Sequence, residues 1–165
     1  MNDQADELKT AYRRTAIIGG AMMSTLLLYA FVAFAIASTN DPFEGFVSLE
    51  DGGLLRNLFL GLSLLLVVTI HRLRSRTLRS SDPSGRLATN APGVRSQLLS
   101  RLVANSIVTF ALAESMALYG LVLFLLNGDS TDLYIFLGLS LLTFVMFFPK
   151  YHQWEEWMQR HQQVT

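Results

Sequence analysis

The sequence LVANSIVTFALAESMALYGLVLFLL, residues 102–126, contains a single charged residue, Glu114. An α-helix rises about 1.5 Å per residue, so a helix of this length can cross the roughly 30 Å hydrocarbon core of a bilayer. A helix is required there because hydrocarbon offers no hydrogen-bond partners to backbone amides and carbonyls. This stretch therefore predicts a membrane-spanning helix and decides the class of the fold.

Three other apolar stretches accompany it. Residues 15–37 carry no charge, residues 58–70 reach spanning length when residues 53–57 join them, and residues 133–148 end at Pro149. The chain of 165 residues is only 16% charged, whereas a soluble domain carries about 25% charged residues. We predict an all-α integral membrane four-helix bundle. Its predicted spans are residues 15–38, 53–71, 101–126 and 133–149, joined by residues 39–52, 72–100 and 127–132 and flanked by residues 1–14 and 150–165.

The basic residues orient this bundle. Twelve of the thirteen lie in residues 1–14, 72–101 and 150–165, and Arg56 is the exception. Residues 39–52 and 127–132 carry acids and no base. Positive charge collects on the cytoplasmic side of membrane proteins, so we predict that both termini are cytoplasmic in a multi-pass protein of the inner or plasma membrane. The same arginines predict contact with anionic lipid headgroups and, without interleaved aromatic residues, no nucleic-acid partner.

The C-terminal segment 150–165 has apolar residues at helical spacing. Tyr151, Trp154 and Trp157 lie near one face of a helix. Tryptophan and tyrosine favour the headgroup region of a bilayer, so these three residues predict an amphipathic helix at the membrane interface. A docking surface for a soluble partner is the alternative.

Small residues predict where the helices pack. In lipid, helices associate through small side chains that let the backbones approach closely. The first span has Ala16, Gly20 and Ser24 at steps of four, and the third has Ala113, Ala117 and Gly120. We predict that these two sets form close contacts, either within one chain or between copies in a homo-oligomer.

Glu114 is the residue that requires an explanation. It lies twelve residues from each end of the stretch 102–126, and therefore in the middle of the hydrocarbon. An ionised carboxylate there costs several kcal/mol unless it is protonated, paired or hydrated. It can bind a proton or another ion, tie helices together as a hydrogen-bonded neutral acid, or contact a membrane partner. Its expected hydrogen-bond partners are Ser24, Ser63, Thr69, Ser140 and Thr143.

The residues around Glu114 resemble a known family. Residues 111–122 are ALAESMALYGLV, and the part Glu-Ser-x-Ala-x-Tyr-Gly is similar to the carboxylate-bearing helix of the c subunits of rotary ATP synthases. The resemblance covers residues 102–126 and not the whole chain. It implies that Glu114 binds a translocated proton or sodium ion, with Ser115 and Tyr119 supporting the site. The second span departs from that family, in which the partner helix carries glycines at regular spacing. Residues 58–70 contain only one glycine, Gly61.

The remaining chemistry of the sequence is sparse. There is no cysteine, so disulfides, iron–sulfur clusters and thiol nucleophiles are excluded. We expect no enzyme activity, no metal site and no cofactor other than a bound proton or sodium ion. The predicted function is ion binding in a membrane assembly similar to c subunits. The alternative is a non-catalytic accessory or assembly subunit of a larger membrane complex, in which Glu114 only holds helices together.

Overall fold

The structure is a computed structural model that describes residues 2–40, 42–47, 52–79 and 94–162, with side chains described for residues 6–40, 42–47, 53–75 and 99–156. Over these residues the chain is helical, without a strand, which confirms the all-α class. The helices are α1 (Asn2–Thr39), α2 (Gly52–Arg79), α3 (Val94–Asn127), α4 (Ser130–Phe147) and α5 (Tyr151–Gln162).

Four of these helices are long and apolar enough to cross a membrane. The candidate spans are Asp6–Thr39, Gly53–Ser75, Leu99–Asn127 and Ser130–Phe147. Within the described residues they agree in number with the four predicted spans, whereas the side of the membrane that the termini face stays a prediction. Helix α1 begins at Asn2 and α2 continues to Arg79, well outside the apolar stretches. Neither extension contains proline, so nothing in the backbone ends these helices at the membrane surface.

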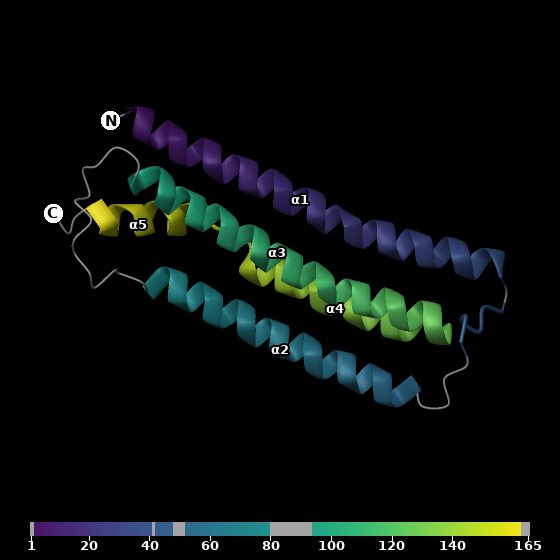
Figure 1. Cartoon of the computed structure of the whole chain (residues 1–165). Coiled ribbons are helices and arrows are strands. Elements are labelled where there is room, and N and C mark those ends of the chain that lie inside the picture. Colours follow the sequence, from purple (N-terminus) through teal and green to yellow (C-terminus); the bar gives the residue numbers. More distant parts are fainter. Residues whose placement is uncertain (1, 41, 48–51, 80–93, 163–165) are drawn as a thin grey trace.

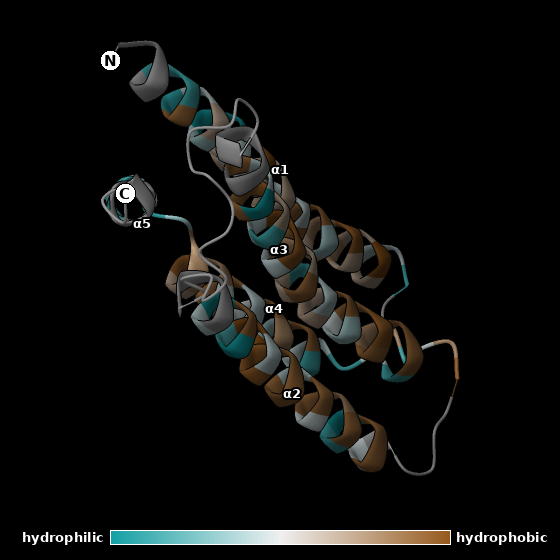
Figure 2. Cartoon of the chain, turned by 60° about the vertical axis from the view of Figure 1, so that its left-hand side comes forward, coloured by the Kyte–Doolittle hydropathy of each residue, from teal (hydrophilic) through white to brown (hydrophobic). Residues whose placement is uncertain are grey.

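Helix α3 is central in the arrangement. It contacts α1, α2 and α4, and its contact with α4 is the most extensive. The four long helices lie side by side, and both termini lie at one end of the molecule (Figure 1). We name this end the terminal end, and the opposite end, where α3 turns into α4, the hairpin end. The helix surfaces are predominantly hydrophobic along their middle sections (Figure 2).

The hairpin end is closed by a segment that precedes α2. The amides of Phe46 and Val47 donate hydrogen bonds to the carbonyls of Leu125 and Leu126, at 2.9 and 3.2 Å. The last carbonyls of a helix have no partner within the helix, so this segment satisfies two that α3 leaves open. Gly45 adopts a φ of +88° there, a conformation that glycine allows without steric cost.

Two glycines set the closest helix contacts. A Cβ atom on Gly120 would lie 2.6 Å from Cβ of Phe136 on α4, and one on Gly19 would lie 2.7 Å from the ring of Phe110 on α3. Ala113 and Ala117 are buried as well. The α3 half of the predicted contact is therefore inside the bundle.

The α1 half of that contact differs from the prediction. Gly20 and Ser24 are exposed, and a Cβ atom on Gly20 would meet nothing within 4 Å. Ala16 is half-buried. Successive helical residues point about 100° apart, so the helix rotation that places Gly19 against Phe110 turns Gly20 away from α3. A contact of Gly20 and Ser24 with a second copy stays a prediction.

Helix α5 folds back onto the terminal end. Trp154 is 5% exposed and packs with Leu8, Leu99 and Leu102, and the ring of Tyr12 meets Trp154 edge-on at 5.7 Å between centroids. The extended ends of α1 and α3 thus cover this tryptophan with protein, whereas the sequence predicted a ring among lipid headgroups. Tyr151 is half-buried beside Tyr12, and the side chain of Trp157 lies outside the described residues.

Two arginines join α2 to α4. At the hairpin end, Nη1 of Arg56 lies 3.7 Å from Oδ1 of Asp132. At the terminal end, Nη1 of Arg74 donates a hydrogen bond of 2.9 Å to the carbonyl of Phe147. Eighteen residues separate the arginines, which corresponds to about 27 Å of helix, close to the thickness of a hydrocarbon core. Both guanidinium groups therefore fit the two edges of the apolar slab. This position explains Arg56, the one basic residue outside the predicted cytoplasmic segments.

Candidate functional site

The carboxyl group of Glu114 lies between α3 and α1. Its Oε1 atom is 2.8 Å from the hydroxyl of Thr25 and 2.8 Å from the hydroxyl of Tyr29. These two residues are four apart on α1, so their side chains lie on the same face of that helix. Glu114 is half-buried. Three oxygen-bearing side chains from two helices thus meet near the middle of the span, and two hydroxyls converge on a single carboxyl oxygen.

The hydrogen atoms at this site limit its protonation states. Thr25 Oγ1 also lies 2.6 Å from the carbonyl of Met22, and a hydroxyl has only one hydrogen to donate. If Thr25 donates to Met22, Oε1 must carry a proton and donate it to Thr25, while Tyr29 donates to Oε1. If Glu114 is ionised, both hydroxyls donate to Oε1 and the bond from Thr25 to Met22 is lost. The first arrangement, with a neutral acid, gives each of these three close oxygen contacts its own hydrogen.

None of the five hydroxyls that the sequence predicted as partners has a described hydrogen bond to Glu114, so that prediction was wrong. Ser24 and Thr69 donate to carbonyls of their own helices, Thr143 does the same, and Ser140 donates to the carbonyl of Ala113 at 2.7 Å. The Ser63 hydroxyl is buried without a hydrogen-bond partner. The signal that could have identified Thr25 and Tyr29 is their spacing, because two hydroxyl residues four apart lie in the middle of a charge-free stretch.

Ser115 and Tyr119, which the resemblance assigns to the ion site, make their described contacts away from the carboxyl group of Glu114. Ser115 donates a hydrogen bond of 2.9 Å to the carbonyl of Ala111 in its own helix. The ring of Tyr119 stacks on Phe59 of α2, with centroids 5.0 Å apart. Five helical residues correspond to a rotation of about 140°, so Tyr119 faces α2 while Glu114 faces α1. A role for Ser115 and Tyr119 in ion binding stays a prediction.

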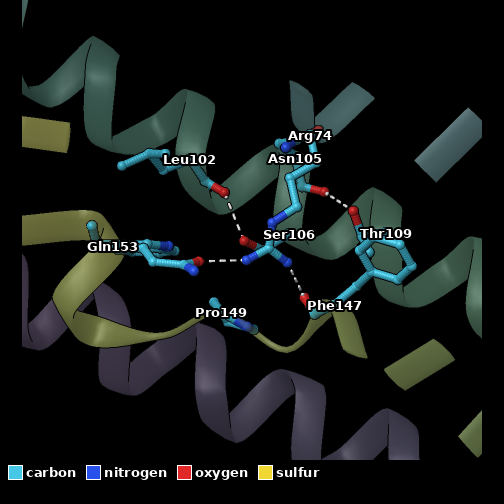
Figure 3. Close-up of a pocket in the computed structure, with 9 residues that line it drawn as sticks. Arg74, Leu102, Asn105, Ser106, Thr109, Phe147, Pro149 and Gln153 are labelled. Atoms are coloured by element: carbon cyan, nitrogen blue, oxygen red, sulfur yellow. Dashed lines mark hydrogen bonds between the residues drawn. The ribbon is translucent and has the colours of Figure 1, made fainter. Parts of the chain in front are cut away.

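A second polar site lies at the terminal end around Arg74. A cavity of about 40 Å³ is lined by Arg74 and by the polar residues Asn105, Ser106 and Thr109 of α3, which is enough room for water. Figure 3 shows the guanidinium group between the carbonyl of Phe147 and the side chain of Gln153, to which it donates hydrogen bonds. Positive charge is favourable at a helix C-terminus. Arg74 therefore joins α2 to the end of α4 and to α5.

Removing this guanidinium group is expected to weaken the terminal end. Arg74→Met keeps the apolar stem and leaves two acceptors without their donor, so the free energy of unfolding should fall by about 1.5–3 kcal/mol, the range for hydrogen bonds to charged groups. The exposed Arg72 is the matched control, because Arg72→Met removes the same charge two residues away. Unfolding in mixed micelles measures both. Equal losses in the two variants would assign the effect to net charge and contradict the described contacts.

Comparison with known proteins assigns the chain to no group. No protein-family model matches it, and no curated protein or solved structure matches it significantly. The resemblance of residues 102–126 to the c-subunit helix is therefore untested by these comparisons. What is established is the class: a helical chain with four helices long and apolar enough to cross a membrane.

Proposed function

We propose that this chain is a small polytopic membrane protein that binds a proton on Glu114 within the bilayer, as part of an ion-translocating assembly similar to c subunits. The observation that carries the proposal is the pair of hydroxyl contacts on Oε1 from Thr25 and Tyr29. Hydroxyls can accept a hydrogen bond from the neutral acid and donate to the carboxylate. They therefore stabilise both protonation states, as a site that takes up and releases a proton requires.

The spacing of these oxygens favours a proton over a sodium ion. Each hydroxyl oxygen lies 2.8 Å from Oε1, which is the usual separation of two oxygens that share a hydrogen. Oxygens that coordinate a common metal ion are pushed farther apart by the ion between them. Sodium binding at Glu114 would therefore require α1 and α3 to separate locally.

The alternative function is that of an accessory or assembly subunit in which Glu114 is structural. The same two contacts support it, because they join α1 to α3 across the middle of the span. In this case Glu114 remains a neutral acid whatever the external pH. Glu114→Gln would preserve the link between α1 and α3 through Tyr29, since an amide oxygen accepts a hydrogen bond from that hydroxyl.

Labelling with dicyclohexylcarbodiimide separates these functions. The reagent enters apolar regions and reacts with protonated carboxyl groups, so the purified chain in lipid nanodiscs should be labelled at Glu114. A proton-exchanging site predicts that labelling falls steadily as the pH is raised into the alkaline range, whereas a permanently neutral structural acid predicts labelling that does not change. Mass spectrometry of the fragment that contains residue 114 measures it, with Glu114→Gln as the unlabelled control.

Two outcomes would contradict the proposal. Failure to label Glu114 in the folded protein at mildly acidic pH would show that the carboxyl is ionised or occupied by another partner. Protection by sodium chloride, but not by the same concentration of choline chloride, would show that the site binds sodium in place of a proton.

A further inference from the structure

A groove between α1 and α3 at the terminal end has the chemistry of a lipid site. It encloses about 550 Å³, within the usual range of small-molecule sites, roughly 300–1,000 Å³. The two helices that form it lie side by side there (Figure 1). It is separate from the Glu114 site, and its function does not depend on the proposal above.

The lining of this groove changes in character along α1. Asp6 and Glu7 lie at its outer end, Arg14 lies two turns deeper, and Ile18 lies in the charge-free stretch. Helix α3 adds the hydroxyl residue Ser100 beside the charged part and the apolar Val103. The charged side chains of the lining therefore change from negative at the end of the bundle to positive closer to its middle, and Ile18 beyond them is apolar. Ala11 and Leu99 add apolar surface beside the charged residues.

We propose that this groove binds a phospholipid whose headgroup carries a primary ammonium group. Such a lipid has the same order of charges: an ammonium group outermost, a phosphate next and acyl chains below. The phosphate would lie on Arg14, the ammonium on Asp6, and one acyl chain along Ile18 and Val103. A guanidinium group is well suited to phosphate, since it offers several fixed donors.

Helix geometry supports this assignment. Asp6 and Arg14 are eight residues apart, about 12 Å along the helix, which is too far for the ion pair that residues three or four apart can form. Side chains on a helix tilt towards its N-terminus, so the long side chain of Arg14 extends outwards and shortens the gap to Asp6. The remaining space between the opposite charges suits a phosphate joined to an ammonium by a two-carbon link. An anionic headgroup without an amine would instead bring its outer part close to the carboxylate of Asp6.

Lipid retention by the full chain tests this inference, with adjacent arginines as a matched pair. The protein is exchanged into vesicles of phosphatidylethanolamine, phosphatidylcholine and phosphatidylglycerol in equal amounts, and lipid that remains bound after detergent extraction is measured by native mass spectrometry. We expect phosphatidylethanolamine to be retained preferentially. Arg14→Gln should lower its retention about tenfold, equivalent to roughly 1.4 kcal/mol of binding free energy, whereas Arg13→Gln, outside the groove and equally exposed, should leave it unchanged.

A second variant tests the ammonium contact by itself. Asp6→Asn should abolish the preference for phosphatidylethanolamine over phosphatidylcholine, whose quaternary amine has no N–H donor, while total phospholipid retention stays within twofold. Equal losses in Arg14→Gln and Arg13→Gln would show general charge attraction and overturn the proposal. Retention of phosphatidylglycerol as strong as that of phosphatidylethanolamine would overturn it as well.

Discussion

Gly120→Leu is expected to lower the free energy of unfolding by about 3 kcal/mol or more, at the upper end of the range for overpacked cores. The reason is the contact between α3 and α4. A Cβ atom on Gly120 would lie 2.6 Å from Cβ of Phe136 and 3.1 Å from the backbone carbonyl of Leu133. Neither neighbour is the movable end of a flexible side chain, so the helices themselves must separate. Ala113 and Ala117, buried on the same helix, would lose their contacts in consequence.

The matched control is a glycine on the opposite helix. A Cβ atom on Gly138 of α4 would meet nothing within 4 Å, so Gly138→Leu should change the stability of the monomer by less than about 0.5 kcal/mol, as surface substitutions do. In a Trp157→Phe background, the fluorescence of Trp154, which is buried between helices, reports unfolding as denaturing detergent is added. A Gly138 variant as unstable as the Gly120 variant would contradict the described packing of α3 on α4.

The second large effect concerns the charge of Glu114. In a bilayer we expect this carboxyl to be neutral, because ionisation in mid-membrane costs several kcal/mol and two hydroxyl contacts offset only part of that cost. Removing one of them by Tyr29→Phe should disfavour the carboxylate further and alter the hydrogen bonding of the neutral acid. Glu114→Gln should keep the contact with Tyr29, because an amide oxygen accepts a hydrogen bond, whereas the Thr25 hydroxyl can donate to that oxygen only by giving up its bond to the carbonyl of Met22. The stability of this variant should therefore stay within about 1 kcal/mol of the parent protein.

Much of the fold could be predicted from the sequence because lipid imposes a simple rule on it. Hydrocarbon excludes charge and unpaired backbone groups, so charge-free stretches mark the four long helices directly. The residues at which the helices begin and end were harder to predict. Helix α1 begins at Asn2, because the residues that precede the span form a helix as readily outside the membrane as within it.

The central residue of the candidate site, Glu114, could be predicted from the sequence, whereas its hydrogen-bond partners could not. A single charge in residues 102–126 identifies Glu114 without any structure. Its partners depend on the rotation of α1 about its own axis, and that rotation is set by Gly19 against Phe110, a contact between residues 91 positions apart. Ser24 and Thr25 are neighbours in sequence but point about 100° apart. Only the packed structure therefore distinguishes Thr25, which contacts Glu114, from Ser24, which does not.

The burial of Trp154 was missed for a similar reason. The composition of residues 151–158 is typical of a helix at a membrane interface, and composition does not reveal whether lipid or protein covers its apolar face. Leu8, Leu99 and Leu102 form the surface that covers Trp154. They lie on α1 and α3, beyond the predicted spans or at their edge, where no sequence pattern indicated a packed cluster.

The neutral carboxyl of Glu114 is tested most directly by infrared spectroscopy of the chain in nanodiscs of ether-linked lipid, which has no ester carbonyl band. A protonated carboxyl has a carbonyl stretching band that a carboxylate lacks. At neutral pH we predict such a band in the parent protein and in Asp132→Asn, which removes the one acid that is fully buried among the described side chains. The band should be absent in Glu114→Gln and shifted in Tyr29→Phe. A parent spectrum without the band, or a band that persists unchanged in Glu114→Gln, would contradict the account.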